Sequence, residues 1–277
     1  MIRAAAALLL LATPVAALER VSFPSANGDA IGGVFAKPEG AGPFPAVVLL
    51  HGCGGFLRSD GRLSSRDAQW NALLVKRGYA VLHVDSFGPR GLRETCTLRD
   101  PPVRPERERP YDAYGGLAWL QARPDIAPSR IGLMGWSNGA MAVLSTLRTD
   151  APARPALAAD FKQAVAFYPG CRAVAAVKPE WDTKIPLAIL IGEADDWTNA
   201  PPCVALAEKT AARGAPVTIK VYPGAYHDFD APDTKLRVRE NVASTRSRTA
   251  TIGTDPAARD DALARVPALL DAALKTR

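Results

Sequence analysis

Histidine is scarce in this chain of 277 residues, which contains only three: His51, His83 and His227. A mechanism that needs an imidazole base therefore has few candidates. Cysteine is also rare, and none of the four is spaced as C-x-x-C, which argues against the common zinc sites. Phosphate-binding glycine loops and clusters of metal ligands are missing as well. The sequence predicts no metal site.

Long apolar runs and charge clusters of one sign are lacking too. Beyond the first residues, no run reaches the roughly 18–20 apolar residues that a membrane helix needs. The formal net charge is +6, but the basic residues are scattered. The densest cluster, 104–109, mixes both signs without aromatic residues, which is typical of a solvated loop. We expect no nucleic-acid partner and no membrane partner for the mature chain, and oligomeric state is not indicated.

The first seventeen residues have the pattern of a secretory signal peptide. A single positive charge at Arg3 precedes an apolar stretch over 4–12, and small residues follow up to Ala17. This stretch is too short for a membrane anchor. We expect cleavage after Ala17, a secreted or periplasmic location, and a single domain over 18–277.

Export would place the four cysteines in an oxidising compartment, where disulfides form. Three pairings are possible. We favour Cys171–Cys203, because each follows the end of a predicted strand and those strands would be sheet neighbours, which leaves Cys53–Cys96. Four free thiols are the alternative if the chain is not exported.

Strand-like and helix-like segments alternate along the chain. The Asn27-Gly28-Asp29 turn predicts a hairpin between strands at 21–23 and 31–35. Continuous apolar runs, typical of strands buried on both faces of a parallel sheet, lie at 45–50, 80–85, 130–135, 164–168, 186–192 and 217–222. Helical patterns occupy 65–77, 111–122, 138–147 and 202–213. This alternation predicts an α/β fold, a mostly parallel sheet of about seven to eight strands with helices on both faces.

The C-terminal part is different. Residues 231–255 are polar and predict irregular structure. Asp255 then precedes Pro256 as the expected N-cap of an amphipathic helix over 257–274. Pro267 predicts a kink or break in that helix.

The most informative motif is Gly135-Trp136-Ser137-Asn138-Gly139. It joins a predicted strand to a predicted helix, which is the context of a nucleophile elbow. Glycines at both ends allow a tight turn that exposes the serine hydroxyl at its tip. Ser137 is therefore the candidate nucleophile.

A serine nucleophile needs a base and an acid, and both belong at the carboxyl ends of strands. His227 follows the last strand of the predicted parallel sheet and is the candidate base. Asp195 and Asp196 follow the preceding strand; we favour Asp195, with Glu193 less suitable. The chain order serine, acid, histidine is that of α/β-hydrolases.

The glycine-dense loop 51–55 follows the strand at 45–50 and is suited to an oxyanion hole. The expected donors are the backbone amides of Cys53 and Asn138. His51 is expected to order this loop by hydrogen bonding. Cys53 as nucleophile is the alternative, which a disulfide would rule out. His83 lies inside a strand and is interpreted as a core residue.

Three further residues are candidates for substrate binding. Trp136 and Tyr226 flank the candidate nucleophile and base, where they would line a pocket or pack in the core. Arg90 follows a strand end, where it would hold a substrate carboxylate or form a structural ion pair.

Together these motifs resemble the dienelactone hydrolase family of α/β-hydrolases. The resemblance runs from Pro45 to Leu274 through the segments 50–55, 85–91, 135–139, 192–195 and 226–229. It implies an α/β-hydrolase fold, no cofactor, and hydrolysis of small-molecule esters or lactones. The family's acid position falls on Asp195.

The chain departs from the dienelactone-cleaving type, which has cysteine in the elbow and glutamate in the oxyanion loop. Ser137 replaces the first, and 51–55 holds no acid. General carboxylic esters are therefore the expected substrates. Peptidase or acyltransferase activity on the same triad is one alternative, and a non-catalytic binding protein on a hydrolase scaffold is another.

Overall fold

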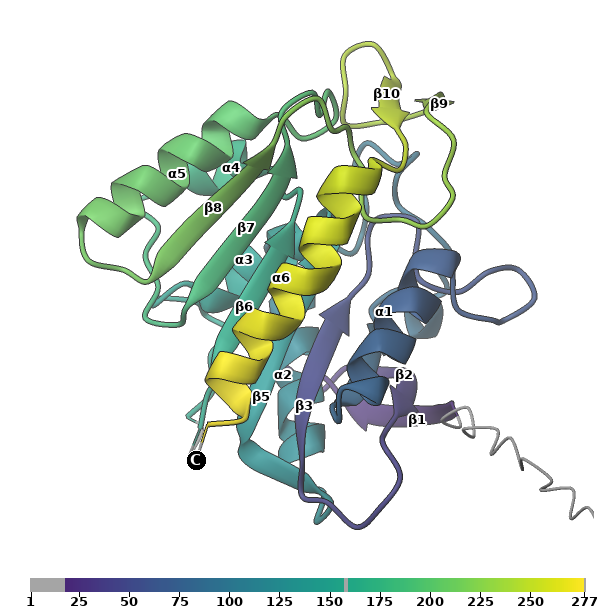
Figure 1. The fold of residues 1–277 in the computed structure, drawn as a ribbon, viewed down its shortest axis with the longest axis vertical. Coiled ribbons are helices and arrows are strands. Elements are labelled where there is room, and N and C mark those ends of the chain that lie inside the picture. The colour runs from purple at the N-terminus through teal and green to yellow at the C-terminus, as the bar shows by residue number, and fades with distance from the viewer. Residues whose placement is uncertain (1–17, 157–158, 277) are drawn as a thin grey trace, which may run out of the picture.

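An eight-stranded sheet forms the centre of the computed structural model, which describes residues 18–156 and 159–276 (Figure 1). The predicted signal peptide over 1–17 lies outside the described residues. The strand order is β1-β2-β4-β3-β5-β6-β7-β8. The first two strands pair antiparallel, β2 also runs antiparallel to β4, and all other pairs are parallel. The strands are β1 Glu19–Pro24, β2 Ala30–Ala36, β3 Phe44–Leu50, β4 Ala80–Asp85, β5 Ile126–Trp136, β6 Gln163–Phe167, β7 Leu187–Gly192 and β8 Val217–Tyr222.

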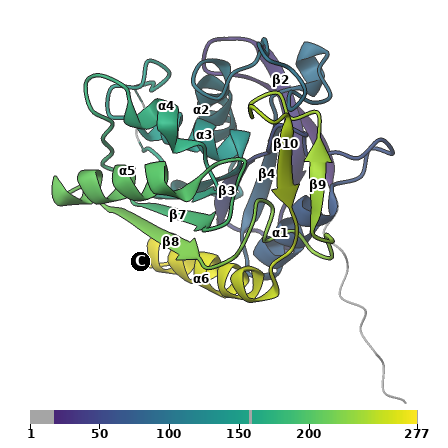
Figure 2. The same cartoon turned by 90° about the horizontal axis from the view of Figure 1, so that it is seen from above.

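Helices cover both faces of this sheet (Figure 2). α1 and α6 lie on one face, and α2, α3, α4 and α5 lie on the other. Their bounds are α1 Ser65–Lys76, α2 Glu108–Gln121, α3 Asn138–Leu147, α4 Cys171–Ala175, α5 Ala200–Ala212 and α6 Pro256–Leu274, and a short 3-10 helix spans Gly88–Arg90. The predicted mostly parallel α/β architecture is confirmed.

Burial along the strands follows their place in the sheet. Every residue of the interior strand β7 is buried, as expected for a strand covered on both faces. The edge strand β8 instead alternates between buried and more exposed residues. Its outer face is therefore partly solvated, and the core lies between the interior strands and the two helix layers.

The C-terminal part contains two departures from the sequence predictions. Within 231–255, which we expected to be irregular, β9 (Arg237–Glu240) and β10 (Thr249–Ile252) form an antiparallel hairpin above the main sheet. Of the kink or break predicted at Pro267, the break is absent, since α6 continues past that residue. Packing explains this result: a side chain at Gly132 of β5 would crowd Leu270 and Leu274, so α6 lies close against the sheet. Asp255 caps α6 as predicted, accepting the Ala258 N–H at 2.8 Å.

Both favoured disulfides are present. Cys53 is joined to Cys96 and Cys171 to Cys203, each with Cα atoms 5.0 Å apart. The first bridge ties the loop after β3 to a loop beyond β4. The second connects the start of α4 to α5. The alternative of four free thiols is therefore wrong.

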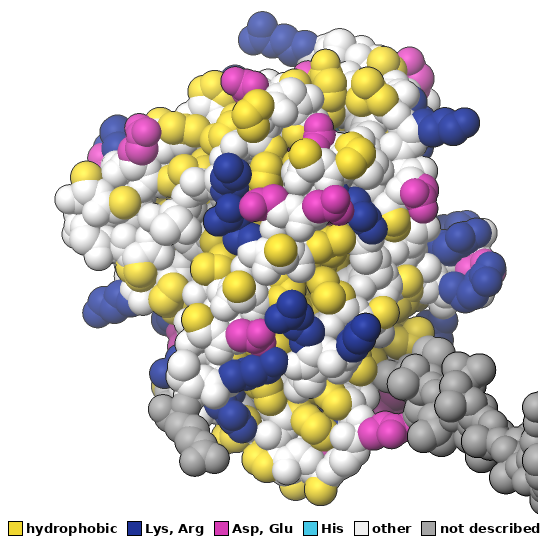
Figure 3. Space-filling model, viewed as in Figure 1, with side chains coloured by type: hydrophobic (Ala, Val, Ile, Leu, Met, Phe, Trp, Pro, Cys, Tyr) yellow, Lys and Arg dark blue, Asp and Glu magenta, His cyan; other side chains and the backbone are white. Residues whose placement is uncertain are grey.

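The face of the molecule that includes α6 carries both basic and acidic side chains among apolar and neutral surface, rather than a patch of one sign (Figure 3). Within the described residues, no helix combines the length and apolar character needed to cross a bilayer.

Candidate active site

Ser137 occupies a strained turn between β5 and α3. Its backbone has φ 51° and ψ −115°, a conformation that non-glycine residues rarely adopt. A Cβ atom at Gly135 would collide with the carbonyl of Gly139, and one at Gly139 would collide with the carbonyl oxygens of Leu50 and His51. Glycine is required at both positions because the backbone segments approach too closely for a side chain. The turn has the strand–turn–helix form of a nucleophile elbow.

A cavity of 570 Å³ opens beside this turn, and we call it the Ser137 cavity. Ser137 itself is 8% exposed. Cys53 and Asn138 contribute to the wall near the elbow, and Trp197 and Thr198 contribute from the loop after β7. The cavity therefore joins the ends of β3, β5 and β7.

Asp195 and His227 are in direct contact. His227 Nδ1 lies 2.8 Å from Asp195 Oδ2, and both side chains are buried. The other carboxylate oxygen accepts the backbone N–H groups of Trp197 at 2.9 Å and Thr198 at 2.8 Å. Because a carboxylate only accepts hydrogen bonds, Nδ1 carries the imidazole proton and Nε2 is left as the acceptor.

Two opposing effects set the basicity of His227. Burial lowers the pKa of the imidazole, but the charge and the hydrogen bond of Asp195 raise it more, and the charge of Asp228 adds to this. Arg66 acts in the opposite direction. The net result is a pKa above the ordinary value of 6.5, which makes neutral His227 a stronger proton acceptor.

The structure distinguishes the three acids that follow β7. Asp196 accepts the Thr251 N–H at 2.7 Å and the Thr251 hydroxyl at 2.8 Å. Glu193 accepts the Gly224 N–H at 3.2 Å. Each of these acids binds a neighbouring loop, and Asp195 is the one beside His227.

Ser137 lines the cavity, whereas His227 lies against Thr198 of its wall, with Nδ1 3.1 Å from the Thr198 hydroxyl. No hydrogen bond joins the Ser137 hydroxyl to His227 in the part of the chain that the structure describes. The imidazole packs 4.4 Å from the Tyr168 ring and 4.7 Å from the Trp197 ring, measured between centroids. Since Trp197 lines the Ser137 cavity, His227 packs directly against a residue of the cavity wall. Catalytic hydrogen bonds are often long without substrate.

Two candidate oxyanion-hole residues line the same cavity. Cys53 and Asn138 both line it, and neither N–H donates to an acceptor among the described residues. The Cys53 carbonyl is fixed by the Thr95 N–H at 2.8 Å. Asn138 begins α3, where the first N–H groups have no partner within the helix. Since Cys53 is in a disulfide, it has no thiol to act as a nucleophile.

The structure corrects two of the predicted substrate-binding residues. Trp136 is fully buried in the core, where its indole stacks on Phe167 and is shut off from the Ser137 cavity. Arg90 forms a bidentate ion pair with Asp112, both contacts at 2.8 Å, and also pairs with Asp29 at 3.0 Å. Trp136 therefore packs in the core and Arg90 forms a structural ion pair, which were the alternatives to substrate binding. Tyr226 is half-buried on the loop before His227 and is not part of the cavity wall.

The other two histidines are structural, as expected. The Nδ1–H of His51 donates to the Gly52 carbonyl at 2.8 Å, which orders the loop that carries Cys53. Burial, followed by the charge of Arg109, holds the pKa of His51 well below its ordinary value. Burial also lowers the pKa of His83 to about 3. Both imidazoles are neutral at physiological pH.

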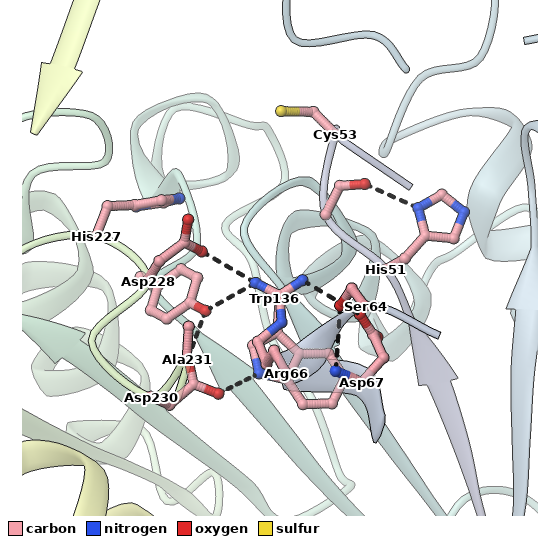
Figure 4. Close-up of polar contacts among 12 residues, drawn as sticks. His51, Cys53, Ser64, Arg66, Asp67, Trp136, His227, Asp228, Asp230 and Ala231 are labelled. Carbon is pink, nitrogen blue, oxygen red and sulfur yellow. Dashed lines mark hydrogen bonds and ion pairs between the residues drawn. The ribbon is translucent and has the colours of Figure 1, made fainter. Parts of the chain in front are cut away.

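A buried polar network beneath the site was missed by the sequence analysis (Figure 4). Arg66 of α1 donates to Asp228 at 3.0 Å and to the Tyr168 hydroxyl at 3.2 Å. Tyr168 in turn donates to Asp230 at 2.6 Å. The second oxygen of Asp230 accepts the indole N–H groups of Trp70 at 2.8 Å and Trp136 at 2.9 Å. We call these six residues the Arg66 network.

The Arg66 network joins the loop of His227 to the elbow and to α1. One signal for it was present in the sequence, namely two acids on alternate positions directly after His227 among apolar neighbours. Their partners could not be identified, because Arg66 lies more than 160 positions away. Thr198 was missed for a related reason: its hydroxyl lies 2.9 Å from Asp195 Oδ2 only because the loop after β7 folds back.

Metal ligands do not gather anywhere in the described ranges, where no group of three or more histidine, cysteine or acidic side chains could hold an ion.

Comparison with known proteins adds sequence evidence to this geometry. The sequence profile of the dienelactone hydrolase family matches residues 31–274. YtaP of Bacillus subtilis (strain 168), whose name assigns it as a hydrolase, is 30% identical over 129 residues. That match covers 42% of this chain and 43% of YtaP, so it spans less than half of the relative.

Solved structures share the fold at low sequence identity. Esterase 2 of Thermogutta terrifontis, phosphoramylated by tabun, is 16% identical with a TM-score of 0.61, and the match covers 92% of this chain and 94% of that one. The acylaminoacyl peptidase of Pyrococcus horikoshii is 15% identical with a TM-score of 0.68 over 95% of this chain and 43% of that one. The dienelactone hydrolase-like promiscuous phosphotriesterase P91, from metagenomic libraries, is 16% identical with a TM-score of 0.62, and the match covers 93% of this chain and 98% of that one. At such identities these likenesses support the fold alone.

Proposed function

This chain belongs to the dienelactone hydrolase family, a family of hydrolases, and we propose that it cleaves carboxylic esters or lactones through an acyl-enzyme. The observation that carries the proposal is the 2.8 Å contact between Asp195 and His227 beside the cavity that Ser137 lines. Ser137 attacks the ester carbonyl while His227 Nε2 takes its proton. Asp195 holds the proton-bearing Nδ1 and stabilises the imidazolium that forms.

The tetrahedral intermediate carries a negative oxygen that must be stabilised. In the proposed mechanism the amides of Cys53 and Asn138 donate to this oxygen, which suits two N–H groups without another acceptor in the part of the chain that the structure describes. His227 then returns the proton to the leaving alcohol. Water attacks the acyl-enzyme with His227 again as base, and the acid is released.

We also propose that the protein works outside the cytoplasm. The signal-peptide pattern of 1–17 and the two disulfides support this, since disulfides persist in oxidising compartments.

A fluorophosphonate probe tests the proposed chemistry directly. The wild-type protein should become labelled on the peptide that contains Ser137 and should hydrolyse nitrophenyl esters faster than the matched anilides. Absence of labelling and turnover would favour a binding protein on a hydrolase scaffold. Faster cleavage of the anilides would favour a peptidase, and faster transfer to an added alcohol than to water would favour an acyltransferase.

The two adjacent acids give a matched pair of variants. Asp195→Asn should lower kcat for ester hydrolysis by about 10³–10⁴-fold, because asparagine no longer fixes the tautomer or stabilises the imidazolium. Asp196→Asn should retain most of the activity, since Asp196 bonds Thr251 instead. Steady-state kinetics on both purified variants measure this difference. Equal losses would contradict the assignment of Asp195.

The pH profile of kcat/KM should report the His227 base. Only the neutral imidazole accepts the serine proton, so activity should fall as the pH drops below its pKa in the free enzyme. Because Asp195 raises that pKa, the midpoint of the acid limb should lie above 6.5. A midpoint clearly below this value would indicate that another group serves as base.

A further inference from the structure

A second cavity adjoins the Ser137 cavity, and we call it the distal cavity. It measures 650 Å³ and lies between the start of α2, the outer side of α3 and the short helix α4. The two cavities share four wall residues, Pro105, Glu106, Met141 and Ala173. The two cavities therefore meet at these residues, and only side chains separate the Ser137 cavity from the distal cavity.

Met141 stands at the junction, one helical turn beyond the serine. Its N–H donates to the Ser137 carbonyl at 2.9 Å, so the two residues lie on the same side of the helix start. Its sulfur would be 3.3 Å from a side chain at Gly170, which has none. A flexible, unbranched thioether between two cavities can move aside for an apolar chain.

The distal cavity has an apolar floor, formed in part by Ala153 and Val174, both buried, and by Val177. The charged side chains of its wall are already paired: Glu106 with Arg104, Arg107 with Glu108, and Arg148 with Asp150, at 3.8, 3.6 and 2.7 Å. The Ser145 hydroxyl donates to the Met141 carbonyl at 3.1 Å. The wall has two acidic and two basic side chains and so presents no net charge to an ionic ligand, whereas its floor suits a neutral apolar one.

We propose that the distal cavity binds the long apolar group of an ester whose carbonyl lies at Ser137, so that the preferred substrates are esters of elongated, uncharged chains. This inference rests on the proposed hydrolase function and adds the substrate class. The apolar group can belong to the acyl part or to the alcohol part of the ester, and both place the same chemistry against Met141 and the apolar floor.

Chain-length series test the proposal. One series holds the nitrophenyl alcohol constant from acetate to decanoate, and the other holds acetate constant with alcohols from ethyl to decyl. In one of them kcat/KM should rise by up to about fourfold for each methylene that enters the distal cavity. Flat or falling values in both series, with clear turnover of the acetate, would overturn the inference and leave the proposed function intact. No turnover of any ester would refute both.

Two variants on and next to α4 locate the effect. Ala173 is exposed and lies in both walls, so Ala173→Trp should block the passage; Val177→Trp should fill the distal cavity alone. Both should lower kcat/KM for the longest good substrate at least tenfold. Val177→Trp, outside the Ser137 cavity, should leave acetate turnover unchanged, which also shows that it folds, and thermal melting checks the fold of Ala173→Trp. Ala175→Trp is the matched control, because Ala175 is exposed on the same helix outside both cavities. An unchanged chain-length preference in the first two variants would overturn the assignment.

Discussion

Ser137→Ala is expected to lower kcat for ester hydrolysis by roughly 10⁴–10⁶-fold, with little change in folding stability. The loss is large because Ser137 forms the covalent bond to the acyl group in the proposed mechanism. Cys53, the alternative nucleophile of the sequence analysis, lines the same cavity but is held in a disulfide. Stopped-flow or steady-state assays with a nitrophenyl ester measure the loss, and thermal melting monitors the fold.

Two further variants make this prediction more specific. His227→Ala should be nearly as inactive as Ser137→Ala, and the double variant should be no worse than either, because residues that act as one unit are not additive. Ser22→Ala, on the exposed side of β1, should behave as wild type. If the fold-loss of kcat in the double variant instead equals the product of the two single losses, Ser137 and His227 do not act in one step.

Arg66→Leu is expected to have the largest effect on stability, about 3–5 kcal/mol. The guanidinium is mostly buried, bonds Asp228 and Tyr168, and lies 5.4 Å from the centroid of the Trp136 ring. Asp67, at 3.8 Å, and Asp230 are buried carboxylates that depend on the same cation. Leucine would leave these negative charges in the interior without compensation.

Chemical denaturation of the wild type and of Arg66→Leu measures this loss of stability. The same measurement at several pH values gives a second test. Burial already raises the pKa values of Asp67 and Asp230, and the Arg66 charge opposes that rise. Without the cation, the pKa values of Asp67 and Asp230 in the folded protein should rise further. The variant then loses folding stability while the two carboxylates are ionised, and this loss disappears when they are protonated. The deficit of Arg66→Leu should therefore shrink as the pH falls from 8 toward 5.

Arg62→Leu is the matched control for this variant. Arg62 lies just before α1 and pairs with Asp60 at 2.7 Å, but its side chain is 76% exposed. Pairs this exposed contribute little to folding stability, because solvent screens them. A similar loss of stability in both variants would show that the Arg66 network does not depend on its buried charge.

Strands and helices could be predicted where their burial produces a recognisable pattern of apolar residues within one continuous segment of the sequence. β3 and β7 are continuous apolar runs because both of their faces are covered. The hairpin β9–β10 could not be predicted in the same way, since its strands are short and polar, and β9 is largely exposed. At Pro267 a local rule was overridden by packing of α6 against β5.

For the site, sequence order and strand ends sufficed to nominate Ser137, Asp195 and His227. They could not separate Asp195 from Asp196, because adjacent residues differ only in the loop that each faces. Trp136 shows the same limit, since its position in the motif does not reveal that its ring points into the core. The Arg66 network lies beyond such reasoning altogether, because its members come from four distant segments.

The two glycines of the elbow have a meaning of their own. Gly135 and Gly139 are dictated by the crowding of main-chain atoms between the central strands and α3, whatever chemistry takes place above them. A descendant that lost its hydroxyl and all activity would still have to keep both. In distant sequences, the glycine pair therefore indicates only that the turn is present. The residue midway between the two glycines is the one that indicates catalytic activity.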